Sequence, residues 1–361
     1  MKKALIRVFA VLLIVVLSLG VVGCHKPGEI AVTIEDEKFT SGFYACVFLA
    51  ADNEARELIS KQATEQNITI TEKNLYEQKI DGVLYADWVK AKVTENFKML
   101  IAAKNLCEKN SVDTASALET AKATAKTEWQ NNREYFEKNG IGLESYQKFC
   151  AYQQYSTSYF DYLYRKGGVE EVTEDTINKF VQENYVYVDI ISKNITDMTD
   201  AQKQDEEKKF KEYVDRIKKG ESFGKIVAEI NTTTYTEDKT DEGTFSHSQA
   251  MILGSENAGE YFVSPLFDTV KGYKKGDIKV LVTEKAIDGY TYMLLGYFGD
   301  ILSEKNTSLT DIKEDALYAM KNDEFVKKIE DAAKDIVVKE NKKSTKQFKV
   351  QKVYYPATVN Y

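Results

Sequence analysis

Histidine is nearly absent from this sequence, which has two histidines, His25 and His247, among 361 residues. Two histidines are too few for a multi-histidine metal site, and no Cys-x-x-Cys pair accompanies them. A Ser/His/Asp triad would have only His247, or His25 near the start of the chain, as its base. No nucleophile elbow, phosphate-binding loop or dinucleotide-binding glycine pattern occurs. The sequence therefore predicts no metal and no cofactor.

Long apolar runs are also scarce, and the one that occurs extends from Val8 to Leu19. It is shorter than the roughly 20 residues that a membrane-spanning helix needs. Basic residues precede it and small residues follow it, which is the order of an export signal. Gly23 and Cys24 come next, and Cys24 resembles the first mature residue of bacterial lipoproteins. The alternatives are an uncleaved anchor and an ordinary signal peptide with a chance cysteine.

The lipoprotein resemblance implies a signal peptide over residues 1–23 and a diacylglycerol on the Cys24 thiol. Two acyl chains hold a protein stably at a membrane. Residues 1–23 carry three positive charges and no negative one, so their removal would take the formal net charge from −8 to −11. An acidic chain argues against nucleic acid, whose binding needs a basic face. It also argues against adhesion to anionic lipid through the protein surface.

Three further cysteines, Cys46, Cys107 and Cys150, are an odd number, so they cannot all pair with one another. Export would permit a disulfide, but the spacing does not identify one. Buried free thiols are the favoured state.

Hydrophobic periodicity predicts helices on both sides of a mixed α/β segment. The first expected strand covers residues 30–34. Helices are expected over residues 39–59, 71–110, 111–138, 143–165, 173–185, 199–219, 222–230 and 309–336. Thr199 and Gln202 fit a capping box at the start of one of them. Further strands are expected at residues 185–191, 279–283, 289–298 and 348–355.

The helix expected over residues 143–165 is rich in aromatic side chains at helical spacing. We expect these side chains to pack against neighbouring helices. The alternative is a groove for unfolded polypeptide, because tyrosine is amphipathic and common at binding surfaces. The candidate client-binding residues are Tyr152, Tyr155, Tyr159 and Tyr162.

A series of short motifs runs through residues 185–300. In chain order they are Val188–Ile191, Arg216–Phe223, Gly243–Phe245, Gln249–Met251, Phe262 with Phe267, Lys275–Ile278 and Gly289–Tyr290. No single motif is specific, but their order and spacing resemble those of a parvulin-type peptidyl-prolyl isomerase domain. In that family the first and last strands are neighbours and carry a pair of catalytic histidines.

The resemblance places Asp189 and Thr291 at the two histidine positions, with His247 out of register with both. Rotation about an X-Pro bond has a barrier near 20 kcal/mol, which the isomerase pocket must lower. Asp189 and Thr291 are therefore degenerate catalytic candidates, which either hydrogen-bond each other in place of the histidines or are ordinary strand residues. The implied apolar seat for the proline ring consists of Met251, Phe262 and Phe267.

The whole chain resembles extracytoplasmic foldases of the PrsA and SurA type. This resemblance implies an α+β fold, with a mostly helical chaperone lobe built from both ends of the chain and an inserted parvulin-like α/β domain. The expected parts are a signal peptide over 1–23, a helical lobe over 24–184, a parvulin-like domain over 185–302, and a returning segment over 303–361. In that arrangement the strand at 348–355 would pair with the strand at 30–34.

PrsA-type proteins of Gram-positive bacteria are lipoproteins that help secreted proteins to fold, which agrees with Cys24. The resemblance therefore implies a membrane-tethered chaperone or foldase on the extracytoplasmic face of the cell membrane. Its partners would be unfolded or partly folded exported proteins. The alternatives are an active peptidyl-prolyl cis-trans isomerase and a solute- or glycan-binding lipoprotein. The altered histidine positions argue against the first, and the helix-dominated N-terminal half argues against the second.

Overall fold

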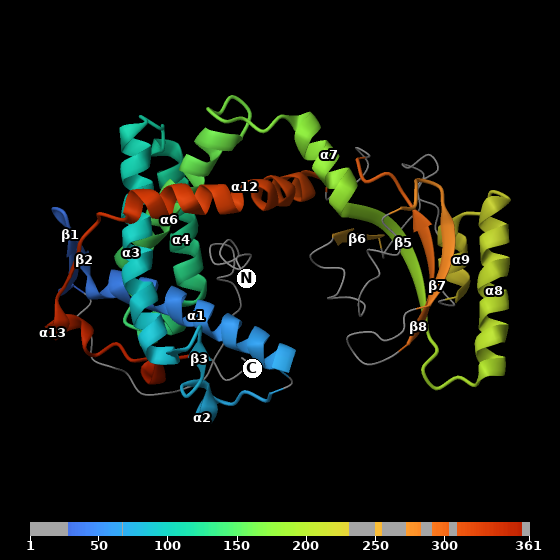
Figure 1. Ribbon diagram of the computed structural model, residues 1–361, viewed down its shortest axis with the longest axis horizontal. Coiled ribbons are helices and arrows are strands. Elements are labelled where there is room, and N and C mark those ends of the chain that lie inside the picture. The colour runs from blue at the N-terminus through green and yellow to red at the C-terminus, as the bar shows by residue number, and fades with distance from the viewer. Residues whose placement is uncertain are drawn as a thin grey trace. The chain divides into compact units, whose positions relative to one another are not determined.

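A computed structural model describes residues 28–66, 68–230, 250–254, 272–282, 291–302 and 309–355. The chain divides into two compact units (Figure 1). The terminal unit contains the described residues up to Val172 and from Tyr318 onward, and the central unit contains those from Thr173 to Leu317. Helices predominate and the sheets are small, so the predicted α+β class is confirmed. Among the described residues, no helix is both long and apolar enough to cross a membrane.

Both ends of the described chain meet in one small sheet of the terminal unit. Strand β1 (Ile30–Ile34) lies between β2 (Glu37–Thr40) and β9 (Val338–Glu340), and both pairings are antiparallel. The expected strand at 348–355 is therefore wrong, because β9 takes its place and residues Val350–Lys352 form a 3₁₀ turn. The ladder ends at Asn341, whose side-chain amide donates to the Ile30 carbonyl while its side-chain oxygen caps α13 (Lys342–Thr345).

The helices of the terminal unit pack around a shared core (Figure 1). One expected helix, over residues 71–110, is interrupted: α2 (Glu72–Leu75) is followed by a hairpin of β3 (Lys79–Ile80) and β4 (Val83–Leu84). Asp81 and Gly82, at the hairpin turn, both have positive φ, which an Asp-Gly pair adopts readily. The long helices are α1 (Ser41–Gln66), α3 (Tyr85–Lys109), α4 (Ala115–Asn131) and α6 (Leu143–Tyr164), and α5 (Arg133–Lys138) is short.

Aromatic side chains from β2, α1, α3 and α6 form the centre of this core. Phe43 lies between Phe39 and Phe97, with ring centroids 4.7 and 5.7 Å away. Phe149 and Tyr152 of α6 meet Phe43 edge-on, at 5.8 and 5.6 Å. Such pairs add roughly 0.5–1.5 kcal/mol each beyond their burial. The core therefore holds α1, α3 and α6 against the small sheet.

The central unit is built on a four-stranded antiparallel sheet with the order β6-β5-β8-β7. Its chain runs through α7 (Glu174–Asn184), β5 (Tyr185–Asn194), α8 (Asp200–Lys218), α9 (Phe223–Ile230), β6 (Ala250–Gly254), β7 (Ile278–Val282) and β8 (Tyr292–Phe298). The capping box at Thr199 is confirmed, since the Thr199 N–H donates to Gln202 Oε1 at 2.8 Å. Helix α12 (Leu309–Ala333) begins in this unit and continues into the terminal unit.

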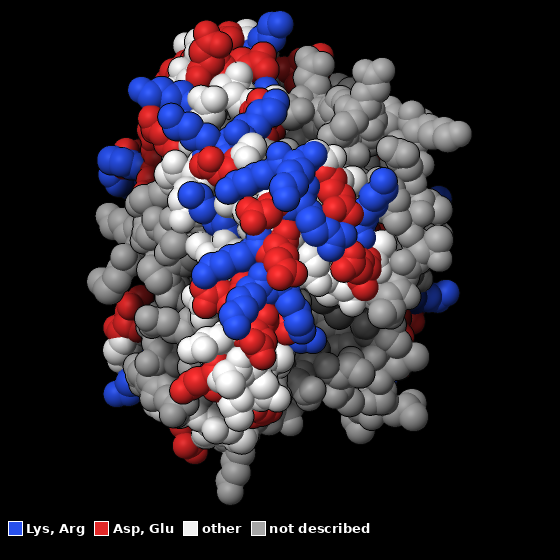
Figure 2. All heavy atoms as spheres, turned by 90° about the vertical axis from the view of Figure 1, so that its right-hand side faces the viewer, with Lys and Arg blue, Asp and Glu red and all other residues white. Residues whose placement is uncertain are grey.

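The exposed face of α8 carries charges of both signs (Figure 2). Lys208 pairs with Asp205, and Arg216 joins Glu221 and Glu229, each at 2.7 Å, so that α8 is tied to α9. Exposed pairs of this kind each contribute little to stability. Because basic and acidic residues alternate along α8, both signs of charge lie side by side on this face.

Candidate functional site

Three predicted site residues, Cys24, Phe262 and Phe267, lie outside the described residues, as do both histidines. Their roles remain predictions. Met251 is described through its backbone, which lies in β6 opposite Val188 of β5. The neighbouring pair in the same ladder is Asp189 with Ala250, so the sheet brings the backbones of Asp189 and Met251 together.

The strand register separates the two candidate catalytic positions. Asp189 of β5 pairs with Tyr297 of β8, whereas Thr291 precedes β8 and accepts a hydrogen bond from the Ile195 N–H at 2.9 Å. Thr291 is thus six residues along the strand from the partner of Asp189, a separation of about 20 Å at roughly 3.3 Å per residue. This register does not fit the alternative in which Asp189 and Thr291 hydrogen-bond each other. The antiparallel pairing puts them at opposite ends of the ladder.

The tyrosine stripe of α6 lies mainly in the core. Tyr152 and Tyr159 are each 7% exposed, and the Tyr152 hydroxyl donates to the Glu37 carboxylate. Tyr159 packs against Tyr162 and against Phe325 of α12, with ring centroids 6.0 and 6.2 Å away. Side chains so enclosed line no open groove, so Tyr152 and Tyr159 fit the packing interpretation. Tyr155 and Tyr162 are half-buried and keep a face toward the surface.

Exposed apolar side chains occur instead at neighbouring positions of the chain where the hairpin joins α3. Val83 and Leu84 of β4 are 43% and 47% exposed, and Trp88 follows in the first turn of α3. Trp88 is half-buried, and its indole N–H has no hydrogen-bond partner among the described residues. The other tryptophan, Trp129, donates to the Ile141 carbonyl at 3.0 Å. We call Val83, Leu84 and Trp88 the hairpin junction.

Leu84 is also an unusual residue for its position at the N-cap of α3, where it supplies no side-chain hydrogen bond. Ser, Thr, Asp or Asn at an N-cap accepts a bond from the first turn and stabilises a helix by about 1 kcal/mol. Leu84 is thus a half-exposed apolar residue at an N-cap, where a polar residue would stabilise the fold. Sequence reasoning missed the hairpin junction, although the Asp81-Gly82 pair between apolar residues was a signal for the hairpin.

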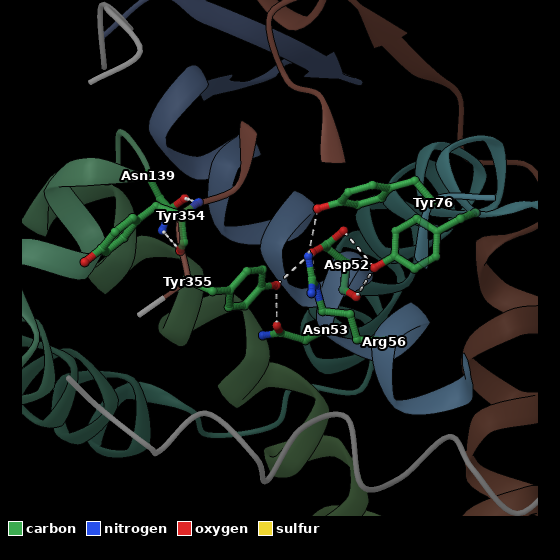
Figure 3. A network of polar contacts seen from close by, with 8 residues as sticks. Asp52, Asn53, Arg56, Tyr76, Asn139, Tyr354 and Tyr355 are labelled. Atoms are coloured by element: carbon green, nitrogen blue, oxygen red, sulfur yellow. Dashed lines mark hydrogen bonds and ion pairs between the residues drawn. The ribbon is translucent and has the colours of Figure 1, made fainter. Parts of the chain in front are cut away.

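A second cluster is a buried polar network on α1 (Figure 3). Asp52 is 0% exposed, and its carboxylate accepts from Arg56 Nε at 2.9 Å and from the Tyr85 hydroxyl at 3.0 Å. The Tyr355 hydroxyl lies 2.7 Å from Asp52 Oδ2 and 2.6 Å from Asn53 Oδ1, so its single proton serves one of the two at a time. The Asp52 carboxylate is therefore bound by a residue 303 positions further along the chain.

The electrostatics of this network favour a charged Arg56 guanidinium and neutral phenols on Tyr85 and Tyr355. Burial raises the pKa of Tyr85 and of Tyr355 well above the ordinary tyrosine value, and the neighbouring Asp52 raises both further. Burial by itself would lower the pKa of Arg56, but the Asp52 carboxylate outweighs it and raises that pKa. Arg56 also lies over the Tyr355 ring, with its guanidinium carbon 4.1 Å from the ring centroid.

Asn139, the residue after α5, holds the backbone of the same C-terminal segment (Figure 3). Its side-chain nitrogen donates to the Tyr354 carbonyl at 3.0 Å, and its side-chain oxygen accepts from the Tyr354 N–H at 2.9 Å. The same nitrogen donates to the Tyr135 carbonyl at 3.0 Å. Lys138 lies over the Tyr354 ring, 4.3 Å from its centroid. Val353–Tyr355, which we call the tail segment, is thus bound by side chains of α1 and α5.

No protein-family model and no curated protein matches the sequence. Among solved structures, the chain is similar to the foldase protein PrsA from Streptococcus pneumoniae, at 17% identity and a TM-score of 0.34, over 71% of this chain and 91% of that one. It is also similar to the foldase protein PrsA from Lactococcus lactis, at 12% identity and a TM-score of 0.33, over 88% and 97% of the two chains. For PrsA from Bacillus subtilis the identity is 13%, the TM-score 0.27, and the coverage 69% and 85%. The predicted resemblance to PrsA-type foldases is thus found again among solved structures.

Proposed function

We propose that the protein is a lipid-anchored folding factor that binds unfolded or partly folded exported polypeptides at the extracytoplasmic face of the cell membrane. The hairpin junction carries this proposal, because exposed apolar side chains on a rigid helical scaffold are what an unfolded client needs to contact. The export signal and Cys24 support the location.

The architecture of the central unit supports the parvulin-like part of the proposal. The resemblance implies that its first and last strands are neighbours, and β5 pairs with β8 over seven residues. The separation of Asp189 from Thr291 leaves these two positions unable to act together on one prolyl bond. We therefore infer that the central unit contributes binding surface or shape and has weak or no isomerase activity.

The binding chemistry of the hairpin junction suits sequence-tolerant recognition. Val83 and Leu84 are successive residues of a strand, so their side chains point to opposite faces of the two-stranded ribbon. Both side chains are partly exposed, although Ile80, the strand partner of Val83, is buried at 1% exposure. Trp88 adds an aromatic surface and a hydrogen-bond donor, a combination common among the residues that dominate binding. Such a site would bind apolar segments weakly and without nucleotide.

An aggregation assay tests the proposal. The chain from residue 24 onward, with Cys24→Ser to leave out the lipid, is added while a chemically denatured model protein is diluted into buffer. We expect slower light scattering at substoichiometric amounts, and weaker protection when Trp88 is replaced by Ser. The Trp129→Phe variant is the matched control, because Trp129 is tied to Ile141 away from the hairpin junction. A parent chain that neither slows aggregation nor crosslinks to the denatured protein would refute the proposal.

A further inference from the structure

The tail segment is bound in the way that proteins bind an extended peptide. The Asn139 side chain hydrogen-bonds both the N–H and the C=O of Tyr354. Such a contact recognises the main chain and does not depend on the side chain at that position. The next residue, Tyr355, extends its ring under Arg56 and its hydroxyl to Asp52 and Asn53 (Figure 3). The backbone of Val353 is extended.

We propose that Asp52, Asn53, Arg56, Lys138 and Asn139 form a binding site for extended aromatic segments of unfolded polypeptide, which Val353–Tyr355 occupies as an internal ligand. We call these five residues the tail site. The proposal rests on the proposed function, since it names a class of client segment. The ligand chemistry is an aromatic residue with free backbone N–H and C=O groups, followed by a tyrosine.

The tail site keeps its own internal partners when the tail segment leaves. Asp52 would still accept from Arg56 and from Tyr85, so its charge remains paired. Asn139 would still donate to the Tyr135 carbonyl. A buried charge left without a partner would be strongly destabilising, but none is created here. The site is therefore preformed, which lowers the cost of binding a ligand from another chain.

Recognition at the tail site divides between backbone and side chain. The bidentate contact of Asn139 fixes the register, and Lys138 and Arg56 each present a cation to one ring, at 4.3 and 4.1 Å. The pair Asp52 and Asn53 then distinguishes tyrosine from phenylalanine, because a phenylalanine ring offers no hydroxyl to either oxygen. A segment with serine in place of both tyrosines would keep only the backbone contact.

Attachment to the same chain gives the tail segment an advantage over any external peptide. A short flexible link would give an effective concentration on the order of 1 mM, and the folded turn Val350–Lys352, with Val350 2% exposed, makes that value a lower limit. A peptide whose intrinsic Kd is about 100 μM would therefore find the site roughly 90% occupied, and its apparent affinity would fall about tenfold. Removing the tail segment from the tail site should therefore raise the apparent affinity of the peptide about tenfold.

The experiment compares the full chain with its Tyr354→Ser/Tyr355→Ser variant, both with Cys24→Ser, by fluorescence anisotropy. The probe is a labelled peptide with the sequence of residues 350–358, and the control peptide has serine for both tyrosines. We expect the double variant to bind the tyrosine peptide about tenfold more tightly than the parent does, and neither chain to bind the serine peptide.

Two further substitutions in the double variant locate the site. Asn139→Ala should abolish binding, whereas Asn132→Ala should leave it unchanged. The two positions are matched, because each asparagine follows a helix and donates to the carbonyl four residues back at 3.0 Å. A double variant that binds no more tightly than the parent, or that unfolds, contradicts a preformed site and overturns the proposal. Equal effects of Asn132→Ala and Asn139→Ala overturn it as well.

The aggregation assay separates this inference from the proposed function. A double variant that still slows aggregation but does not bind the peptide would overturn only the tail site as a client site. A parent chain without protective activity would refute the proposed function, whatever the peptide does.

Discussion

The Leu84→Ser substitution separates client binding from folding stability at the hairpin junction. Leu84 is 47% exposed, so serine forfeits about half of the roughly 2 kcal/mol that full burial of a leucine contributes. Serine at the N-cap of α3 would accept a hydrogen bond that Leu84 does not, a gain of about 1 kcal/mol. The two effects nearly cancel. We therefore expect the free energy of unfolding to change by less than about 1 kcal/mol.

Client protection should respond much more strongly than stability does. If Leu84 is one of the few contacts that dominate binding, its loss weakens binding by about 1.4 kcal/mol, so about tenfold more variant would be needed for equal suppression of aggregation. Urea unfolding and light scattering measure the two quantities on the same preparation. The control is Val169→Ser, because Val169 is 65% exposed in the terminal unit but lies outside the hairpin junction. Full protection by the Leu84→Ser variant would refute the assignment of this surface.

Three other predictions follow from the geometry. In a protease-coupled proline-peptide assay, the chain should show the uncatalysed rate, and Asp189→Ala and Thr291→Ala should not alter it; a clear acceleration that either change removes would contradict the register argument. Asp52→Asn should lower the free energy of unfolding in urea by about 3 kcal/mol, because it removes the negative charge of a buried ion pair in which Asp52 Oδ2 lies 2.9 Å from Arg56 Nε; a change under about 1 kcal/mol would be inconsistent with that pairing. Hydrogen bonding from Lys321 lowers the pKa of Glu324 to about 2, from an ordinary value of 4.5. Its stabilising effect is thus complete above about pH 4.5 and is lost as the pH falls toward 2, so Glu324→Gln should reduce the loss of stability across that range, by a small amount since the side chain is 43% exposed.

Local patterns in the sequence determined the elements whose causes are themselves local. The capping box at Thr199 needs only Gln202 three positions later, and it forms as predicted. The spacing of aromatic residues in α6 puts Phe149, Tyr152 and Tyr159 on a packed face, because helical geometry fixes which side chains share a side. The α+β class follows from the same periodicities. The lipid on Cys24 remains a prediction from the sequence.

Only the tertiary structure decided which distant segments meet. The strand that pairs with β1 is Val338–Glu340 and not the expected segment at 348–355, and Asn341 then ends the ladder by donating to the Ile30 carbonyl. The register between β5 and β8 separates Asp189 from Thr291, and a strand pattern cannot fix a register between two strands. The tail site unites α1, α5 and the tail segment, so no short stretch of sequence contains it.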